Sequence, residues 1–210
     1  MKNNIMIAGI FLLLFTGCSS SRITSSWSAA DASPKKYNKV MVLGLIRDQD
    51  RSISEYMEKH FVDDLKDLGY NAVSAQVQFG PKAFENMCEK DAVDKIRSSG
   101  ADAVITIVLL DKSKEQYYVP AQRQNLPRSV YYRRFGGYYT TIYDRIYSPG
   151  YYVTDTKYFW ESNLYDMTTK DLVYSVQTES FDPNSSESMG HEYGKLIVEN
   201  MVKKNVLIKQ

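Results

Sequence analysis

The sequence predicts a mixed α/β (α+β) fold: a single compact domain with a mixed sheet and helices packed on it. Two patterns indicate this class. In the first half, apolar strand-like runs alternate with segments of helical spacing in the order β-α-β-α-β. In the second half, two long strand-like runs and a short polar loop predict a C-terminal antiparallel hairpin, followed by a final helix. At 210 residues and 43% hydrophobic content, the chain is long enough to bury a core.

Residues 1–17 have the features of a signal peptide. Lys2 supplies a positive charge, and the apolar run from Ile5 to Phe15 is too short to span a bilayer as a helix. The residues Phe15-Thr16-Gly17-Cys18 resemble the lipobox of bacterial lipoproteins, with Phe15 where that pattern usually has Leu. The alternatives are an ordinary secretory signal with an incidental cysteine, or a transmembrane anchor.

The lipobox resemblance implies cleavage before Cys18, followed by its lipidation. The sulfur would carry diacylglycerol and the new N-terminus a further acyl chain such as palmitate, and several chains anchor a protein stably. Ser19, rather than Asp, follows the cysteine, which favours the outer membrane in such lipoproteins. We therefore expect an envelope protein held in the outer membrane by its lipid, with the folded part facing the periplasm.

The next stretch, residues 18–34, is predicted to be a lipidated serine-rich tether, because residues 19–34 include seven serines. Trp27, a lone tryptophan in this stretch, is expected to dock on the domain. The domain itself is predicted to span residues 35–210, with a tyrosine- and arginine-rich insertion at 117–152.

The first predicted strand and helix follow one another directly. Residues 39–46 form a short apolar run that is typical of a buried strand. Residues 48–68 carry apolar side chains at helical spacing, from Ile53 to Leu68, and Gly69 is the expected stop. Ser52 and Glu55 have the spacing of a capping box.

The elements that follow repeat this alternation. Residues 70–75 are predicted to be a second strand, and residues 83–99 a second helix that ends at Gly100. The run 101–110 is the strongest strand of the chain and continues with more polar alternation to Val119. Cys88, in the second helix, is expected to be a half-buried small hydrophobe.

The C-terminal part is predicted to contain strands at 151–166 and 172–181, joined by the loop 167–171. Ser185 or Ser186 can cap the final helix. Its apolar face is formed by Met189, Tyr193, Leu196, Ile197, Asn200 and Met201, and His191 lies off this face.

Several of these segments resemble envelope lipoproteins of the penicillin-binding-protein-activator, curli-secretion-channel and TolB amino-terminal type, and more closely a set of uncharacterised bacterial lipoproteins. The segments are the strand 40–46, the helix with Arg51 and Glu55, the Gly100-to-Val104 strand entry, and residues 164–174. The resemblance covers roughly residues 38–111 and 155–205. It implies a compact periplasmic α/β domain that binds other envelope proteins, and it includes no catalytic residue.

The insertion at 117–152 departs from that pattern. It holds ten of the 17 tyrosines, together with five arginines against the single acid Asp144. Tyrosine and arginine are enriched in binding hot spots. The alternatives are structural cover of a sheet face and a disordered loop. The candidate binding residues are Tyr131, Tyr132, Arg133, Arg134, Phe135, Tyr138, Tyr139 and Arg145.

The sequence offers little for catalysis. It has no phosphate-binding glycine loop, no Cys-x-x-Cys, no His-Glu-x-x-His and no Gly-x-Ser-x-Gly motif, and only two histidines. No catalytic residue, cofactor or metal site is predicted. Loss of Lys2 with the signal leaves 25 basic and 25 acidic residues, so steering of nucleic acid by net charge is not expected either.

These observations predict a non-enzymatic, lipid-anchored interaction module in assembly or maintenance of the cell envelope. Its expected partners are the membrane, through the lipid, and an envelope protein. One alternative is a subunit of a homo-oligomeric secretion or pore assembly. A second alternative is binding or processing of cell-wall glycan, with peptidoglycan as the partner.

Overall fold

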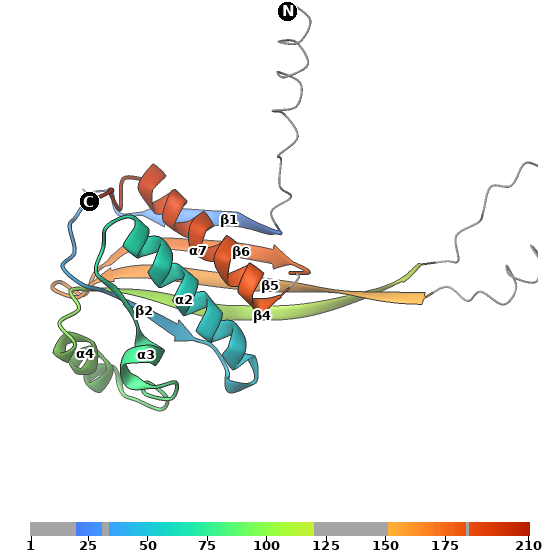
Figure 1. The fold of residues 1–210 in the computed structure, drawn as a ribbon, viewed down its shortest axis with the longest axis horizontal. Helices are drawn as coiled ribbons and strands as arrows, with labels where there is room; N and C mark the ends of the chain where they lie inside the picture. The colour runs from blue at the N-terminus through green and yellow to red at the C-terminus, as the bar shows by residue number, and fades with distance from the viewer. Residues whose placement is uncertain (1–19, 31–33, 120–150, 184) are drawn as a thin grey trace, which may run out of the picture. The chain divides into compact units, whose positions relative to one another are not determined.

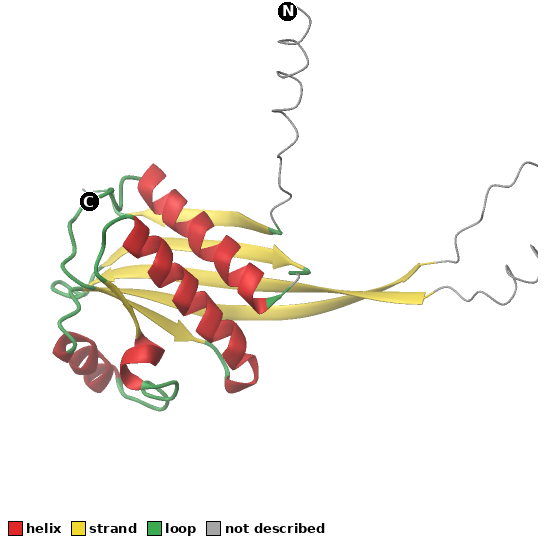
Figure 2. Ribbon diagram, in the orientation of Figure 1, coloured by secondary structure: helices red, strands yellow, loops and turns green. Residues whose placement is uncertain are grey.

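The computed structural model describes residues 20–30, 34–119, 151–183 and 185–210. The described residues form one six-stranded mixed sheet with four helices packed against it, which confirms the predicted fold class (Figures 1 and 2). The chain divides into two compact units, one formed by residues 1–112 with 158–210 and the other by residues 113–157.

The sheet has the strand order β1-β6-β5-β4-β2-β3. The strands are β1 (Ser21–Ser28), β2 (Val40–Leu45), β3 (Ala72–Ser74), β4 (Ala103–Val119), β5 (Tyr151–Asp166) and β6 (Leu172–Phe181). β2 pairs in parallel with both β3 and β4, whereas β1 pairs antiparallel with β6. The sheet is therefore mixed, and β1 and β3 are its two edges.

Two long helices, α2 (Arg51–Asp67) and α7 (Ser186–Lys203), lie side by side across one face of the sheet (Figure 1). The main core fills the space between them and the strands. Val40 and Val42 of β2 point into this core, as do Ile105 and Ile107 of β4. Trp160 of β5 is fully buried there.

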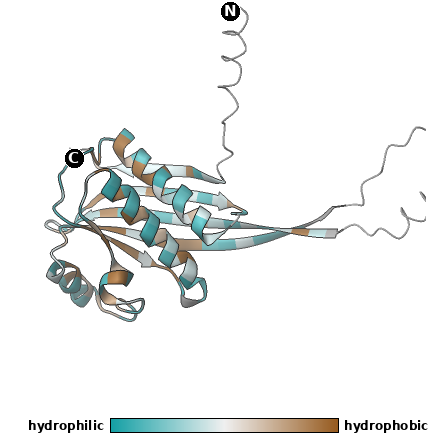
Figure 3. Cartoon of the chain, in the orientation of Figure 1, coloured by the Kyte–Doolittle hydropathy of each residue, from teal (hydrophilic) through white to brown (hydrophobic). Residues whose placement is uncertain are grey.

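A smaller core lies on the opposite face. Met41 and Leu43, which alternate with the previous pair along β2, pack there with Val104 of β4. The short helix α3 (Ala75–Phe79) and the helix α4 (Glu89–Ser98) cover this part of the sheet. Apolar residues are concentrated on β2 and the neighbouring part of β4, as their near-continuous apolar sequences require for strands buried on both faces (Figure 3).

Most predicted elements are confirmed within a few residues. β2, β4, the hairpin of β5 and β6, and α7 lie where the sequence places them. The buried face of α2 includes Ile53, Met57, Phe61 and Leu65. Ser185 caps α7 through a hydrogen bond from the Ser188 N–H, and the Ser188 side chain completes a capping box.

The capping box predicted at the start of α2 is wrong. A 3-10 turn, η2 (Asp48–Asp50), precedes the helix, and Asp50 takes the N-cap position without a side-chain cap. Ser52 and Glu55 therefore lie inside the helix. Glu55 instead pairs with Arg51 one turn earlier, with 3.0 Å between Oε1 and Nε.

The helix predicted over 83–99 begins six residues late, at Glu89. Residues 81–86 form turns, and Asn86 adopts a left-handed φ of 55°, which an α-helix does not allow. Cys88 is the N-cap residue of α4 and is exposed rather than half-buried. The expectation that this side chain is half-buried was wrong, because the residue lies in front of α4 and outside both cores.

Part of the predicted tether is a strand. Residues Ser21–Ser28 form β1 and pair with β6, from Ser21 opposite Ser180 to Ser28 opposite Tyr174. The free-tether prediction therefore does not hold for these residues, because a partner strand over 140 residues away supplies their hydrogen bonds. Trp27 lies on this strand and remains 49% exposed.

Two aspartates in the segments used for the family resemblance hold the fold together. Asp102 accepts hydrogen bonds from the backbone N–H groups of Asn38 and Lys39, which tie the start of β2 to the start of β4. Asp166 accepts from the Thr168 N–H inside the hairpin loop, with 2.8 Å between Oδ1 and N. These residues have structural roles.

The unit formed by residues 113–157 contains the outer parts of β4 and β5. Its described residues are joined by cross-strand polar contacts, including Lys157 Nζ to Glu115 Oε1 at 2.7 Å. Most of the predicted insertion at 117–152 lies outside the described residues.

Candidate functional site

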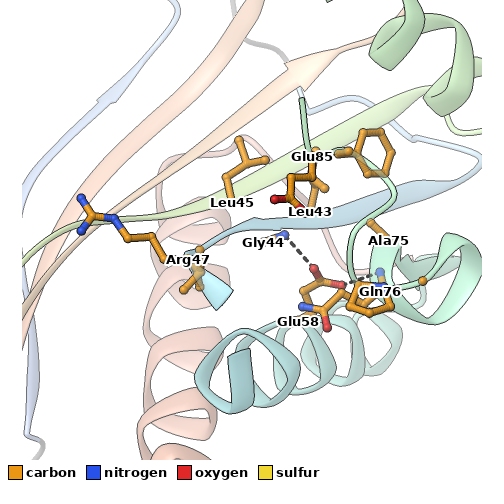
Figure 4. A pocket seen from close by; sticks show the side chains of 12 residues that line it. Leu43, Gly44, Leu45, Arg47, Glu58, Ala75, Gln76 and Glu85 are labelled. Atoms are coloured by element: carbon orange, nitrogen blue, oxygen red, sulfur yellow. Dashed lines mark hydrogen bonds between the residues drawn. The ribbon is translucent and has the colours of Figure 1, made fainter. Parts of the chain in front are cut away.

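A cleft of about 450 Å³ lies at the carboxyl end of β2, in the unit that contains residues 1–112 and 158–210 (Figure 4). One side is the end of β2 and the residues after it, from Leu43 to Arg47. The other sides are Glu58 of α2, the start of α3, and the loop that contains Gly80 and Phe84. Ligands in α/β sheets commonly bind beyond the carboxyl ends of parallel strands, and the volume lies in the range of known ligand pockets.

The cleft exists because two neighbouring strands end at different points. β3 pairs with β2 only as far as Ser74, which lies opposite Val42. The chain then turns into α3, and the Ser74 hydroxyl accepts a hydrogen bond from the Val77 N–H as the helix cap. β2 continues for three more residues, paired with β4 up to Leu45 opposite Val108. Among the described residues, one edge of β2 thus has no partner strand beyond the point where Ser74 lies opposite Val42.

Glu58 occupies part of the place that a longer β3 would fill. Its Oε1 accepts a hydrogen bond from the Gly44 N–H at 2.7 Å. Its Oε2 accepts from the Gln76 N–H at 3.1 Å and from the Ser74 hydroxyl. The side chain is 1% exposed. One carboxylate therefore joins α2 to the end of β2, the end of β3 and the start of α3.

Gly44 lets α2 approach the strand this closely. A Cβ at this position would lie 2.5 Å from the Ser54 hydroxyl and 3.0 Å from Glu58 Oε1. A larger side chain would fit there only if the side chains of Ser54 and Glu58 moved. A glycine inside a buried strand often marks such an approach of another group to the backbone.

Burial and hydrogen bonding act in opposite directions on the Glu58 carboxylate in the cleft. Burial raises the pKa of Glu58, while the hydrogen bonds from Ser74 and from the backbones of Gln76 and Gly44 oppose that rise. Both carboxylate oxygens are already engaged. The described residues that line the cleft include no histidine or cysteine, and the second carboxylate among them, Glu85, is exposed at the edge. In this arrangement the Glu58 carboxylate accepts hydrogen bonds from three groups of the protein itself.

The opposite side of β2 gives the cleft an apolar wall. Leu43 and Leu45 project from the strand on the side away from Glu58 (Figure 4). Leu43 is buried in the smaller core, whereas Leu45 is 48% exposed. Phe84 packs edge-to-face on Phe79 beside them, with ring centroids 5.8 Å apart. The cleft therefore offers an apolar wall on one face of the strand and a polar one on the other.

A second group of titratable residues lies between α2 and α7. The rings of His60 and His191 are 5.5 Å apart between centroids. Within the described residues, His60 Nε2 and Asp64 Oδ2 are buried and have no hydrogen-bond partner. Burial lowers the pKa of His60 and raises that of Asp64 to about 6. His191 is exposed, as its position off the apolar stripe predicts.

The predicted site residues lie outside the described residues. This applies to Cys18 and to Tyr131, Tyr132, Arg133, Arg134, Phe135, Tyr138, Tyr139 and Arg145. The lipidation site and the tyrosine–arginine surface therefore stay predictions.

Sequence reasoning did not identify Glu58 or Gly44. The available signal was the position of Ser54 and Glu58, each one residue after a member of the apolar stripe of α2, together with a glycine inside an apolar strand. Neither feature predicts the contact between Glu58 and Gly44, because the two residues belong to elements that are separate in the chain.

In the described part of the chain, no group of three or more His, Cys, Asp or Glu side chains is arranged to hold a metal ion. None of the helices described is both long and apolar enough to cross a membrane.

No protein-family model matches the chain, and no curated protein matches it in sequence. Among solved structures, it is similar to the PelC dodecamer from Paraburkholderia phytofirmans, with 14% identity, a TM-score of 0.43, and 90% of this chain and 98% of that chain covered. It is also similar to the lipoprotein GNA1162 from Neisseria meningitidis, with 14% identity, a TM-score of 0.42, and coverage of 79% and 98%.

A third similar structure is a putative neuraminyllactose-binding hemagglutinin homolog from Helicobacter pylori, with 10% identity, a TM-score of 0.39, and coverage of 84% and 92%. At TM-scores below 0.5, these likenesses carry no argument about function, partners or assembly.

Proposed function

We propose that the chain is a lipid-anchored protein of the bacterial cell envelope that acts without catalysis, as an interaction module, and binds a segment of an envelope partner in the cleft beside β2. The observation that carries the proposal is that the hydrogen-bonding capacity of Glu58 is used within the protein. The cleft's buried carboxylate accepts three hydrogen bonds from the protein itself. It shapes the cleft and leaves the apolar wall as the part that meets a partner.

The sequence supports the location. Phe15-Thr16-Gly17-Cys18 has the lipobox pattern, and Ser19 follows it. An outer-membrane anchor with the domain in the periplasm would place the cleft within reach of other envelope proteins. The tyrosine–arginine residues from Tyr131 to Arg145 would provide a second contact surface for the same partner, or for wall glycan.

The test is quantitative recovery of partners from envelopes of cells that make a tagged chain. Leu45→Asp places a charge on the exposed apolar wall of the cleft. Val202→Asp makes the same type of change at an exposed residue of α7 and is the matched control. We expect Leu45→Asp to abolish recovery of at least one envelope protein that Val202→Asp retains. Equal partner sets for both variants would refute the cleft as the binding site.

A subunit of a homo-oligomeric assembly is the second candidate. The specific observation in its favour is β1, which is an edge strand of the described sheet, pairs there with β6, and carries the exposed side chain of Trp27. An edge strand can pair with a strand of another copy. Light scattering of the detergent-extracted protein tests this: a Trp27-dependent oligomer supports it, and a monomer at all concentrations refutes it.

A further inference from the structure

The free edge of β2 presents backbone groups to the cleft in a defined order. The Val40 N–H donates to the Asn71 carbonyl on the β3 side, at 2.9 Å. Because backbone direction alternates along a strand, the N–H and carbonyl of Gly44 and the N–H of Ile46 point to the same side. In the part of the chain that the structure describes, no strand lies on this side of β2 beyond Ser74.

Glu58 already satisfies one of these three groups. It accepts from the Gly44 N–H, in the position of the carbonyl that a longer β3 would supply. The Gly44 carbonyl and the Ile46 N–H still face the cleft. In a parallel ladder, one residue of the added strand bonds to both groups, donating its N–H to the first carbonyl and accepting from the second N–H. An antiparallel strand would need the Gly44 N–H itself, which Glu58 occupies.

We infer that the cleft binds an extended peptide segment that adds to the sheet as a short parallel strand beside residues 44–46, in continuation of β3. The inference rests on the proposed function and specifies the chemistry of the partner. Main-chain hydrogen bonds supply affinity in this mode of recognition, and alternate side chains supply specificity.

The register determines which side chains fit. The peptide residue opposite Gly44 faces α2, as Ser74 does opposite Val42. Ser54 and Glu58 fill this side so closely that Gly44 has no room for a Cβ, so this peptide residue must be small. The next peptide residue lies opposite Leu45, beside Phe84, and is therefore apolar. The expected motif is small–apolar, and the apolar residue opposite Leu45 makes both main-chain bonds.

The experiment uses the mature full-length chain in detergent and a phage-displayed library of random hexapeptides. Selected peptides are synthesised with a single backbone N-methyl group at each position in turn, which removes one N–H donor. We expect the motif to be enriched. N-methylation of the residue opposite Leu45 is expected to weaken binding on the order of tenfold, because a buried acceptor loses its partner. N-methylation of the residue opposite Gly44 is expected to have a much smaller effect.

Two variants test the protein side of the same bonds. Ile46→Pro removes the N–H that faces the cleft, and the extended backbone of Leu45 tolerates a following proline. Ile46→Ala removes a comparable part of the side chain but keeps the N–H, so it is the matched control. We expect about tenfold weaker binding for Ile46→Pro and little change beyond the packing loss for Ile46→Ala. If Ile46→Pro does not fold, the N-methyl series alone decides.

The outcomes separate this inference from the proposed function. Peptides that lose binding in Leu45→Asp but tolerate every N-methyl group would overturn strand addition and leave the cleft as a binding site. The absence of any peptide that is sensitive to Leu45→Asp would overturn strand addition as well, and the partner comparison between Leu45→Asp and Val202→Asp would then decide the proposed function on its own.

Discussion

Glu58 shows how a single buried carboxylate can replace a missing piece of sheet. It receives three hydrogen bonds from groups on β2, β3 and α3. We expect Glu58→Ala to lower the free energy of unfolding by about 3 kcal/mol, because it leaves buried N–H and O–H donors without an acceptor. Urea denaturation measures this. Glu55→Ala, an exposed position on the same helix, is the control. A difference of less than about 1 kcal/mol between the two variants would contradict the role assigned to Glu58.

Asp64 should lower the free energy of unfolding as the pH rises through the range in which its carboxyl group loses its proton. Its folded-state pKa is raised to about 6 by burial, so its stabilising contribution is complete below the unfolded pKa of about 4 and is lost as the pH approaches 6 and above. Asp64→Asn removes this titration. Relative to wild type, we expect Asp64→Asn to gain stability between about pH 4 and pH 7 in urea unfolding.

Asp64→Asn has to be compared with wild type at each pH, because the titration of His60 changes the stability in the opposite direction. Burial lowers its pKa, so its contribution is present above the unfolded pKa of about 6.5 and is lost as the pH falls. Lys59, Asp63 and Asp67 of α2, with Glu187, His191 and Lys195 of α7, also act on this pair. A pH-independent difference between Asp64→Asn and wild type would contradict the assignment to Asp64.

At the scale of elements, the contact between α2 and α7 depends on two glycines one turn apart. A Cβ at Gly190 would lie 2.9 Å from the Tyr56 carbonyl oxygen, and one at Gly194 would lie 3.2 Å from the Phe61 Cα and closer still to Asp64. The backbones of the two helices therefore approach closely at these positions.

We expect Gly194→Ala to destabilise the protein by about 2 kcal/mol, because the overpacking outweighs the better helix propensity of alanine. Lys195→Ala, at the next and exposed residue of α7, is the control and should change stability little. Thermal unfolding measures both. A Gly194→Ala variant as stable as wild type would show that the helices can separate without cost.

The element scale also shows where prediction from sequence stops. α2, β4 and α7 follow from apolar periodicity because each is long and its buried side is regular. The serine-rich β1 has no such pattern, since its pairing with β6 depends on a distant strand. Phe84 and Met87 have helical spacing but precede α4. Phe84 is part of the apolar wall of the cleft. Its apolar character therefore comes from a tertiary contact, and its spacing only coincides with that of a helix.

At the scale of the whole molecule, the fold class was predictable but the cleft was not. The β-α-β order and the hairpin are local patterns. The cleft arises from the unequal ends of β2 and β3, and from a carboxylate of α2 that reaches their edge. A sequence pattern contains neither the strand register nor this contact, so Glu58 and Gly44 were not predicted as a pair.

The lipid anchor gives a prediction for the intact protein in cells. Cys18→Ala should abolish labelling by a clickable palmitate analogue and move the protein from the membrane pellet to the soluble fraction. Cys88→Ala is the matched control, because it removes the other cysteine of the chain and should change neither property. Labelling that persists in Cys18→Ala would contradict lipidation at this residue.

The most direct test of the binding cleft is photocrosslinking in living cells. A photoreactive amino acid replaces Leu45 in one strain and Val202 of α7 in another, and the crosslinked peptides are identified by mass spectrometry. We expect position 45, and not position 202, to capture one envelope protein through a single short segment. Replacement of Tyr131, Tyr132, Arg133 and Arg134 by Ala should reduce the crosslinking yield but not abolish it. If position 45 gives no crosslinks, or the same crosslinks as position 202, the protein does not bind its partner in this cleft.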